Sequence, residues 1–232
     1  MTVGLARESR TRRMMILRRQ TGAAASGIHP RLAALRKILR GDGPATWVFT
    51  GEDAGATHAE RRTLANVFES EIRDARHRHD DVVVDTTRPR DRTAALCQNV
   101  RPRVLRFEAD AAFLLLGAGD PRPERIRQET IGLTRTCQIL TENGCTPVLL
   151  PPPQYMLGDA DAIDRMRQRV QIVADQLFLP TIDIADCRRP TDAGRRLLEA
   201  VGYNVENDVR PIDAEEITLM MTRAEQIAAG AL

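Results

Sequence analysis

An uninterrupted apolar run near the middle of the chain, Ala111 to Leu116, constrains the fold more than any other feature of the sequence. A strand with one face in water alternates apolar and polar residues, whereas a strand covered on both faces is apolar throughout. The run ends in Gly117-Ala118-Gly119-Asp120, where a loop can begin. We therefore expect a central strand of a parallel sheet that helices cover on both faces.

Helix and strand patterns alternate on both sides of this run. Apolar residues at helical spacing follow His29-Pro30 and stop at Gly41, and the capping-box sequence Thr57 to Glu60 predicts the start of another helix. Further strands are expected at residues 46–49, 82–84, 147–150 and 181–184, and further helices around residues 94–105 (with a break near Pro102), 126–140, 163–177, 197–201 and from 213 onward. This order predicts an α/β protein, a flavodoxin-like three-layer α/β/α sandwich with a central five-stranded parallel sheet.

One domain accounts for most of the 232 residues. We expect residues 1–27 to be a basic, flexible N-terminal tail and residues 28–232 to form a single α/β domain. The segment from Arg10 to Gln20 is rich in arginine around Met14 to Leu17, an apolar run too short for the core of a signal peptide. No stretch approaches the ~20 apolar residues of a membrane span, so no membrane partner is expected.

The composition of the chain limits the classes of ligand and partner that it could bind. The net charge is only +2, and the basic residues are arginines except for Lys37, a bias typical of a GC-rich bacterial genome. Aromatic residues make up 3% of the chain, which argues against a base-stacking surface and leaves nucleic acid binding to rest on the N-terminal arginines alone. No Gly-rich phosphate loop is present, and we expect no cofactor. The expected partner is a small molecule or a protein of unknown identity, and homo-oligomerisation stays open.

The four cysteines predict neither a metal site nor a redox pair. None of them forms a CxxC pair or has zinc-ligand spacing with a histidine: Cys97, Cys137, Cys145 and Cys187. Cys97 and Cys137 fall on apolar helix faces, where a thiol is usually buried. We expect a reducing compartment and a cytoplasmic location.

The loops at the carboxyl ends of the strands resemble the motif blocks of the SGNH/GDSL hydrolases, a superfamily of esterases and acylhydrolases. Ligands of open α/β sheets bind beyond these strand ends. In order, the matching sequences are Gly51-Glu52-Asp53, Thr87 to Asp91, Gly117 to Asp120, Pro151 to Pro153 and Asn207 to Pro211, and residues 31–41 resemble a leader helix of some bacterial members. The resemblance spans roughly residues 31 to 225 and implies the SGNH hydrolase fold and an ester-hydrolase origin.

At these matching positions, other residues stand in place of those that carry the family's chemistry. The resemblance puts Asp53 at the nucleophilic serine, Arg210 at the histidine base and Asn207 at the aspartate that orients it. Two oxyanion-hole positions also differ, with Arg90 near the family's glycine position and Gly119 in place of an asparagine. An arginine stays protonated near neutral pH and cannot act as a base. We therefore expect no intact catalytic set and a non-catalytic binding or interaction protein.

Several alternatives remain open at the level of sequence. Asp53 and Arg210 or Arg90 could form an internal salt bridge, or Arg88, Arg90 and Arg210 could hold a carboxylate, phosphate or sulfate. An active ester or carbohydrate-ester hydrolase could instead use Asp53 as nucleophile, with His58 as the nearest base in sequence. A flavodoxin-like protein unrelated to the SGNH hydrolases would show a strand order other than 2-1-3-4-5.

Overall fold

The computed structural model describes residues 29–41, 43–52, 63–76, 78–88, 93–117, 123–153 and 160–201. Internal contacts divide the chain into two units, Met1–Gly202 and Tyr203–Leu232, and every described residue belongs to the first. The expected N-terminal tail, the capping box at Thr57 and the expected last helix from residue 213 lie outside the described residues. The domain boundaries therefore stay predictions.

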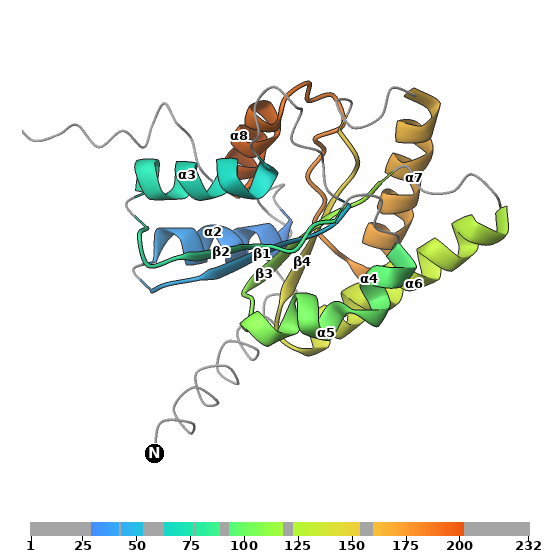
Figure 1. Ribbon diagram of the computed structural model, residues 1–232, viewed down its shortest axis with the longest axis horizontal. Coiled ribbons are helices and arrows are strands. Elements are labelled where there is room, and N and C mark those ends of the chain that lie inside the picture. The colour runs from blue at the N-terminus through green and yellow to red at the C-terminus, as the bar shows by residue number, and fades with distance from the viewer. Residues whose placement is uncertain are drawn as a thin grey trace, which may run out of the picture. The chain divides into compact units, whose positions relative to one another are not determined.

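The described part of the sheet has four parallel strands in the order β2-β1-β3-β4. The strands are β1 (Thr46–Gly51), β2 (Val82–Asp85), β3 (Ala111–Leu115) and β4 (Thr146–Leu150). The apolar run predicted to form a central strand does so, because β3 lies between β1 and β4 with every residue buried (Figure 1). This order agrees with the order expected for the SGNH hydrolases.

The predicted fifth strand at residues 181–184 is only an isolated parallel bridge between Leu149 and Thr181. The N–H of Leu149 donates to Pro180 O at 3.0 Å, and the N–H of Ile182 donates to Leu149 O at 3.1 Å. Pro180 has no N–H, so it cannot donate a further ladder hydrogen bond to β4. After Ile182, the carboxylate of Asp183 accepts the N–H of Ala185 at 3.0 Å and turns the chain. The segment therefore occupies the place of a fifth strand without forming a full ladder.

Helices cover both faces of this sheet (Figure 1). The described helices are α2 (Pro30–Arg40), α3 (Leu64–Arg76), α4 (Thr93–Gln98), α5 (Val100–Arg103), the 3₁₀ helix η1 (Leu105–Phe107), α6 (Pro123–Glu142), α7 (Ala160–Leu177) and α8 (Pro190–Ala200). The helix expected around residues 94–105 is broken into α4, α5 and η1, and Pro102 lies in the middle piece. None of the described helices is long and apolar enough to cross a bilayer.

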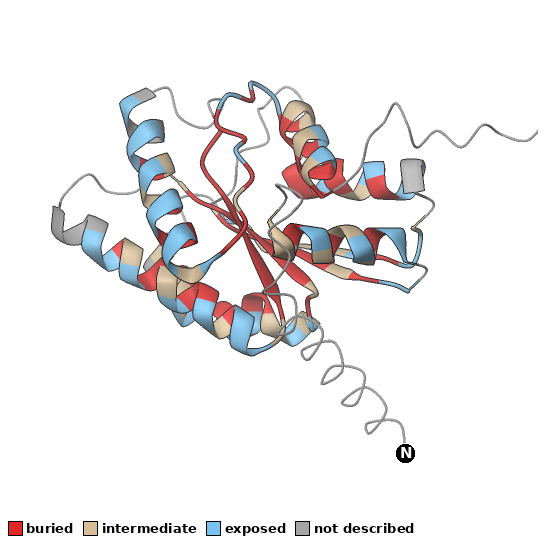
Figure 2. Cartoon of the chain, turned by 180° about the vertical axis from the view of Figure 1, so that it is seen from behind, coloured by how far each residue is buried: buried red, intermediate tan, exposed pale blue. Residues whose placement is uncertain are grey.

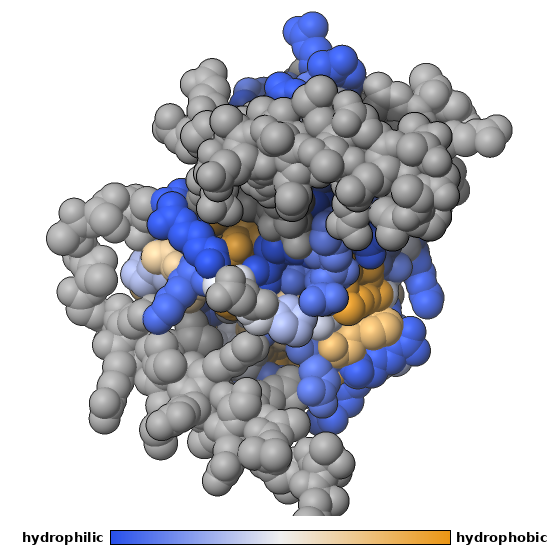
Figure 3. All heavy atoms as spheres, turned by 90° about the vertical axis from the view of Figure 1, so that its left-hand side faces the viewer, coloured by the Kyte–Doolittle hydropathy of each residue, from blue (hydrophilic) through white to orange (hydrophobic). Residues whose placement is uncertain are grey.

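Two apolar clusters hold the layers together, and they use opposite faces of β1 and β3. On one face, Trp47 and Phe49 of β1 meet Phe113 of β3 and Phe68 of α3, with ring centroids 4.7–6.3 Å apart. On the other face, Val48 belongs to a cluster that joins the sheet to α4, α6 and α7. The strands are accordingly buried between the helices in Figure 2, whereas the described surface in Figure 3 is largely hydrophilic.

The helix that precedes the first strand ties three other helices together at their carboxyl ends. In α2, Arg31 donates to the hydroxyl of Thr141 at the end of α6, and the His29 ring lies 4.6 Å from that of Phe178, just after α7. The guanidinium of Arg36 donates from Nε and Nη2 to Ala200 O at 3.2 and 3.0 Å. A cation at a helix C-terminus satisfies a free carbonyl and opposes the helix dipole.

A buried ion pair fixes the amino end of β1. Nη2 of Arg78 lies 2.7 Å from Oδ1 of Asp81, and the two side chains are only 8% and 1% exposed. The carboxylate of Asp81 also accepts the N–H of Ala45 at 2.9 Å and the indole N–H of Trp47 at 2.8 Å. Arg78 in turn donates to the carbonyls of Leu39, Gly41 and Gly43. One pair therefore joins the loop before β1 to the turn before β2.

We expect Asp81→Ala to lower the free energy of unfolding by about 3–5 kcal/mol, because it leaves the Arg78 guanidinium buried without its counter-ion. Urea denaturation measures the loss. The exposed neighbour Asp80 supplies the control, since Asp80→Ala removes the same charge at a surface position. Equal stability of the two variants would contradict the structural role of the pair.

Gly51 ends β1 in a conformation that other residues rarely adopt. Its φ is +106°, and a Cβ on it would lie 2.1 Å from the carbonyl oxygen of Leu115 in β3. We expect Gly51→Ala to lower the free energy of unfolding by about 2 kcal/mol or more, from backbone strain and the clash. Gly43→Ala is the matched control, because a Cβ there would meet nothing within 4 Å. The account of Gly51 fails if both variants melt at the wild-type temperature.

Candidate functional site

The described candidate site is the carboxyl edge of the sheet, where all four strands end. The parallel ladders bring together Glu52 after β1, Thr86 to Arg88 after β2, Leu116 and Gly117 after β3, and Pro151 to Pro153 after β4. In folds of this class the ligand crevice lies beyond this edge of the sheet. The three prolines are buried, and they form the apolar side of the edge.

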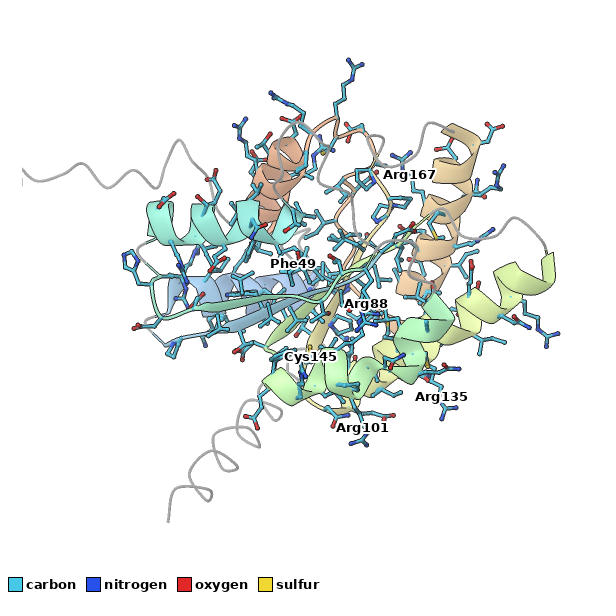
Figure 4. The ribbon with its side chains drawn as sticks, in the orientation of Figure 1. Phe49, Arg88, Arg101, Arg135, Cys145 and Arg167 are labelled. Carbon is cyan, nitrogen blue, oxygen red and sulfur yellow. The ribbon has the colours of Figure 1, made fainter. Side chains whose placement is uncertain are left out.

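Of the residues predicted for the site, Arg88 is the one that the structure describes. Asp53, Arg90, Gly119, Asn207 and Arg210 lie outside the described residues, as does His58. Arg88 is exposed, and its backbone N–H donates to Gly51 O at 3.0 Å. Glu52 and Arg88 form an isolated parallel bridge that continues the β1–β2 register past the end of β2. The backbones of an acidic and a basic residue therefore lie on neighbouring strand positions, and Arg88 is labelled in Figure 4.

The Glu52 side chain reaches across to the end of β3. Its backbone N–H donates to Leu115 O at 3.0 Å, so the residue continues the β1–β3 ladder. Its Oε2 lies 1.1 Å from the position that a Cβ on Gly117 would take. Only a glycine at position 117 leaves room for this carboxylate. Sequence reasoning assigned no role to Glu52, although an acid directly after Gly51 and a glycine directly after an apolar strand were visible.

A buried arginine supports the end of β2. Arg103, in α5, is 4% exposed, and its Nη2 donates to the carbonyl oxygen of Thr86. Thr86 itself donates to Phe49 O from its N–H at 2.8 Å and from its hydroxyl at 3.1 Å. The loop leading to Arg88 is therefore held by hydrogen bonds from two directions. Nothing in the sequence separated Arg103 from the other arginines, because its burial depends on how α5 packs under the sheet.

Asp85 shapes the same loop through a local turn. Its Oδ1 accepts the N–H of Thr87 at 2.9 Å and the hydroxyl of Thr87 at 2.6 Å. Such turns fix the chain immediately after a strand. The described charges of the edge thus include the carboxylates of Glu52 and Asp85, the exposed guanidinium of Arg88 and the buried guanidinium of Arg103 beneath the loop. Arg90 and Arg210, the other arginines expected at this edge, lie outside the described residues.

Acyl transfer by a hydroxyl nucleophile needs a base within hydrogen-bond reach. Of the two histidines in the described part of the chain, His79 lies just before β2, and the ring of His29 lies 4.6 Å from that of Phe178, which precedes the segment bridged to β4. Both therefore lie where strands begin and not where they end. Burial lowers the pKa of His29, and the nearby charge of Arg31 lowers it further. Within the described ranges, no group of acids, histidines and cysteines could hold a metal ion. The described part of the edge therefore shows no hydroxyl–histidine pair.

Comparison with known proteins identifies the fold. No family model matches the sequence, and no curated protein matches it. Among solved structures, this chain is similar to the acetylxylan esterase Axe2 from Geobacillus stearothermophilus, with a TM-score of 0.55, 13% identity, and 69% of this chain and 95% of that chain covered. It is also similar to the lipase/acylhydrolase from Enterococcus faecalis, with a TM-score of 0.52, 17% identity, and 68% and 92% covered.

Another acetyl xylan esterase, AlAXEase, matches with a TM-score of 0.56, 12% identity, and 67% and 99% covered. At these identities the likeness concerns the fold and not the activity. In Axe2, replacement of a serine, a histidine or an aspartate by alanine is described as giving a catalytic mutant. Together with the strand order, these neighbours show that the chain has the α/β fold of the SGNH/GDSL hydrolases.

Proposed function

We propose that this chain is a non-catalytic member of the SGNH-hydrolase fold that binds an anionic ligand at the carboxyl edge of its sheet. The observation that carries the proposal is the set of residues at the motif positions that follow the strands. Glu52 is the first residue beyond β1, and Asp53 follows it directly. The resemblance places the nucleophilic serine at position 53. Asn207 and Arg210 replace the aspartate and the histidine at the spacing of the family motif.

These replacements remove the proton transfers on which ester hydrolysis depends. A serine hydroxyl attacks only when a base accepts its proton, and a carboxylate nucleophile still needs a base that activates water for turnover. The guanidinium of Arg210 is protonated at every pH that the protein experiences, so it can do neither. Loss of one oxyanion-hole donor costs on the order of 10²–10³ in rate, and here two such positions differ.

The same replacements favour anion binding. A guanidinium presents a planar fork of N–H donors that matches a carboxylate or a phosphate. Arg88 is exposed at the edge, and the sequence adds Arg90 in the same loop and Arg210 in the last motif block. If Arg90 or Arg210 instead pairs with Asp53, the ligand meets one guanidinium fewer and binds more weakly.

A second candidate is an active esterase with a rearranged site, because the solved neighbours include acetylxylan esterases and a lipase/acylhydrolase. In that case Asp53 would be the nucleophile. Hydrolysis of p-nitrophenyl acetate by the wild type and the Asp53→Ala variant decides between this alternative and the non-catalytic protein. Homo-oligomerisation and a protein partner stay predictions.

We also propose a cytoplasmic location. All four cysteines are free, and three of them are buried. Burial raises the pKa of the Cys137 thiol to about 12 and that of Cys187 to about 11, so neither thiol forms a reactive thiolate near neutral pH. These cysteines therefore suit a packing role.

We expect the purified chain to hydrolyse p-nitrophenyl acetate no faster than its Asp53→Ala variant, because neither protein has a base for the reaction. Initial rates at pH 7–8, corrected for the buffer rate, measure this. Asp80→Ala controls for surface carboxylates that accelerate hydrolysis without a site. Turnover that Asp53→Ala abolishes and Asp80→Ala leaves intact would establish the esterase alternative.

We expect Arg88→Gln to weaken the binding of inorganic phosphate about tenfold, because it removes a charge-assisted hydrogen-bond donor from the edge. Isothermal titration calorimetry at low ionic strength measures the affinity. Arg101→Gln is the matched control, since Arg101 is an exposed arginine of α5 well separated from Arg88 (Figure 4). An equal loss in both variants would mean that phosphate binds to the general positive charge and not to the edge.

A further inference from the structure

We infer that His29 is a pH-sensitive latch on α2: its neutral ring caps the helix and packs against Phe178, and protonation of that ring releases the first turn of α2. The inference does not depend on the ligand proposed for the carboxyl edge, because His29 lies where strands begin. It assigns a conformational role to a histidine that the proposed function does not use.

The ring of His29 caps α2 in one protonation state only. Its Nδ1 accepts the backbone N–H of Arg31 at 3.2 Å, and its carbonyl oxygen accepts the N–H of Ala33 at 3.1 Å. An Nδ1 that accepts a hydrogen bond carries no proton, so the single proton of the neutral imidazole is on Nε2. A second proton would turn Nδ1 into a donor that faces another donor. Protonation therefore breaks the cap.

The same ring joins α2 to the residue that follows α7. The ring centroids of His29 and Phe178 lie 4.6 Å apart, with an angle of 40° between the ring planes. Phe178 has a φ of +50°, in the left-handed region that residues other than glycine rarely adopt. It is still 56% exposed, so the contact buries only part of its apolar surface. Such a contact can open locally while the core stays packed.

The described groups around His29 oppose a positive charge on its ring, with one exception. On α2, the nearest cation is Arg31, and the start of a helix carries a partial positive charge of its own. On α6, Arg31 meets the hydroxyl of Thr141 and lies near the buried Cys137 thiol, whose pKa of about 12 keeps it neutral. The exception is the backbone of Phe178, which favours the protonated ring.

These surroundings set the sign of the pH dependence. Burial lowers the pKa of His29, the charge of Arg31 lowers it further, and the backbone of Phe178 opposes both. The folded chain therefore resists the proton, whereas the unfolded chain takes it up at the ordinary histidine pKa of about 6.5. The stability that the latch contributes is complete above that pH and is lost as the pH falls below it.

The first turn of α2 carries two of the contacts that this helix makes with its neighbours. Arg31 reaches α6 and His29 reaches the end of α7, whereas Arg36 binds Ala200 O at the end of α8 from further along the helix. Protonation should therefore free the ends of α6 and α7 while Arg36 keeps the rest of α2 in place. Residues 1–28 join the domain through this turn, so the latch makes their attachment depend on pH.

An NMR titration of the full chain between about pH 8 and pH 5 tests the inference. We expect the pKa of His29 to lie below that of the exposed His79. The ring of Phe178 should shift the carbon-bound ring protons of His29 upfield, and this shift should vanish as His29 titrates. The amide resonance of Arg31 should move with the same midpoint, because its hydrogen bond is the cap. The His29→Asn variant assigns the His29 signal.

Urea denaturation at about pH 7.5 and pH 5 measures the effect on stability. Asparagine caps helices well and does not titrate in this range, so His29→Asn should lose less stability between the two pH values than the wild type. His79→Asn is the matched control and should behave as the wild type does, because His79 is exposed. If His29→Asn does not fold, Phe178→Ala replaces it, and the pKa of His29 should then rise toward that of His79.

Three results would overturn the latch. The first is a pKa of His29 at or above that of His79 in the wild type. The second is equal acid sensitivity of the wild type and the folded His29→Asn variant, or an unchanged pKa of His29 in Phe178→Ala. The third is a His29 that titrates below His79 and keeps its contact with Phe178, because protonation would then leave the first turn of α2 closed.

Discussion

The pairing of β1 with β3 is the constraint on which the rest of the described structure depends. It aligns Trp47 with Ala111 and Gly51 with Leu115, so one register fixes both ends of the central pair. The aromatic cluster on one face and the aliphatic cluster on the other both include side chains from these two strands. The same register sets how far Glu52 reaches toward Gly117, so the packing of the core and the geometry of the site have a common origin.

The two ends of β1 carry similar charges in opposite surroundings. At the amino end, the pair of Arg78 and Asp81 is buried and shared among the indole of Trp47 and several backbone groups, so breaking it is costly. At the carboxyl end, Arg88 is exposed, and the half-buried Glu52 turns its carboxylate toward Gly117 at the end of β3. The pair of Arg78 and Asp81 can therefore hold the fold, whereas Arg88 is exposed at the edge where ligands of this fold class bind.

The sequence predicted the sheet better than it predicted the site. The apolar run at Ala111 to Leu116 and the alternation around it were sufficient for the parallel order, because burial on both faces leaves a clear signature. A fifth strand was predicted after Pro180 because the short apolar stretch there resembles a strand. The chain instead turns at Asp183 after an isolated bridge to β4. The roles of Glu52, Arg103 and Asp81 depend on contacts between distant segments, which no local pattern encodes. Five of the predicted site positions remain known only from sequence, because Asp53, Arg90, Gly119, Asn207 and Arg210 lie outside the described residues.

We propose that the chain keeps the fold of the hydrolases and lacks their chemistry. This proposal is tested most directly by returning the family residues to the motif positions in one protein, through Asp53→Ser, Arg90→Gly, Gly119→Asn, Asn207→Asp and Arg210→His, and by measuring hydrolysis of p-nitrophenyl acetate beside the wild type. The account predicts turnover in the substituted protein that is lost when position 53 is changed further to alanine, and none in the wild type above the buffer rate. Wild-type turnover that equals or exceeds that of the substituted protein would contradict it.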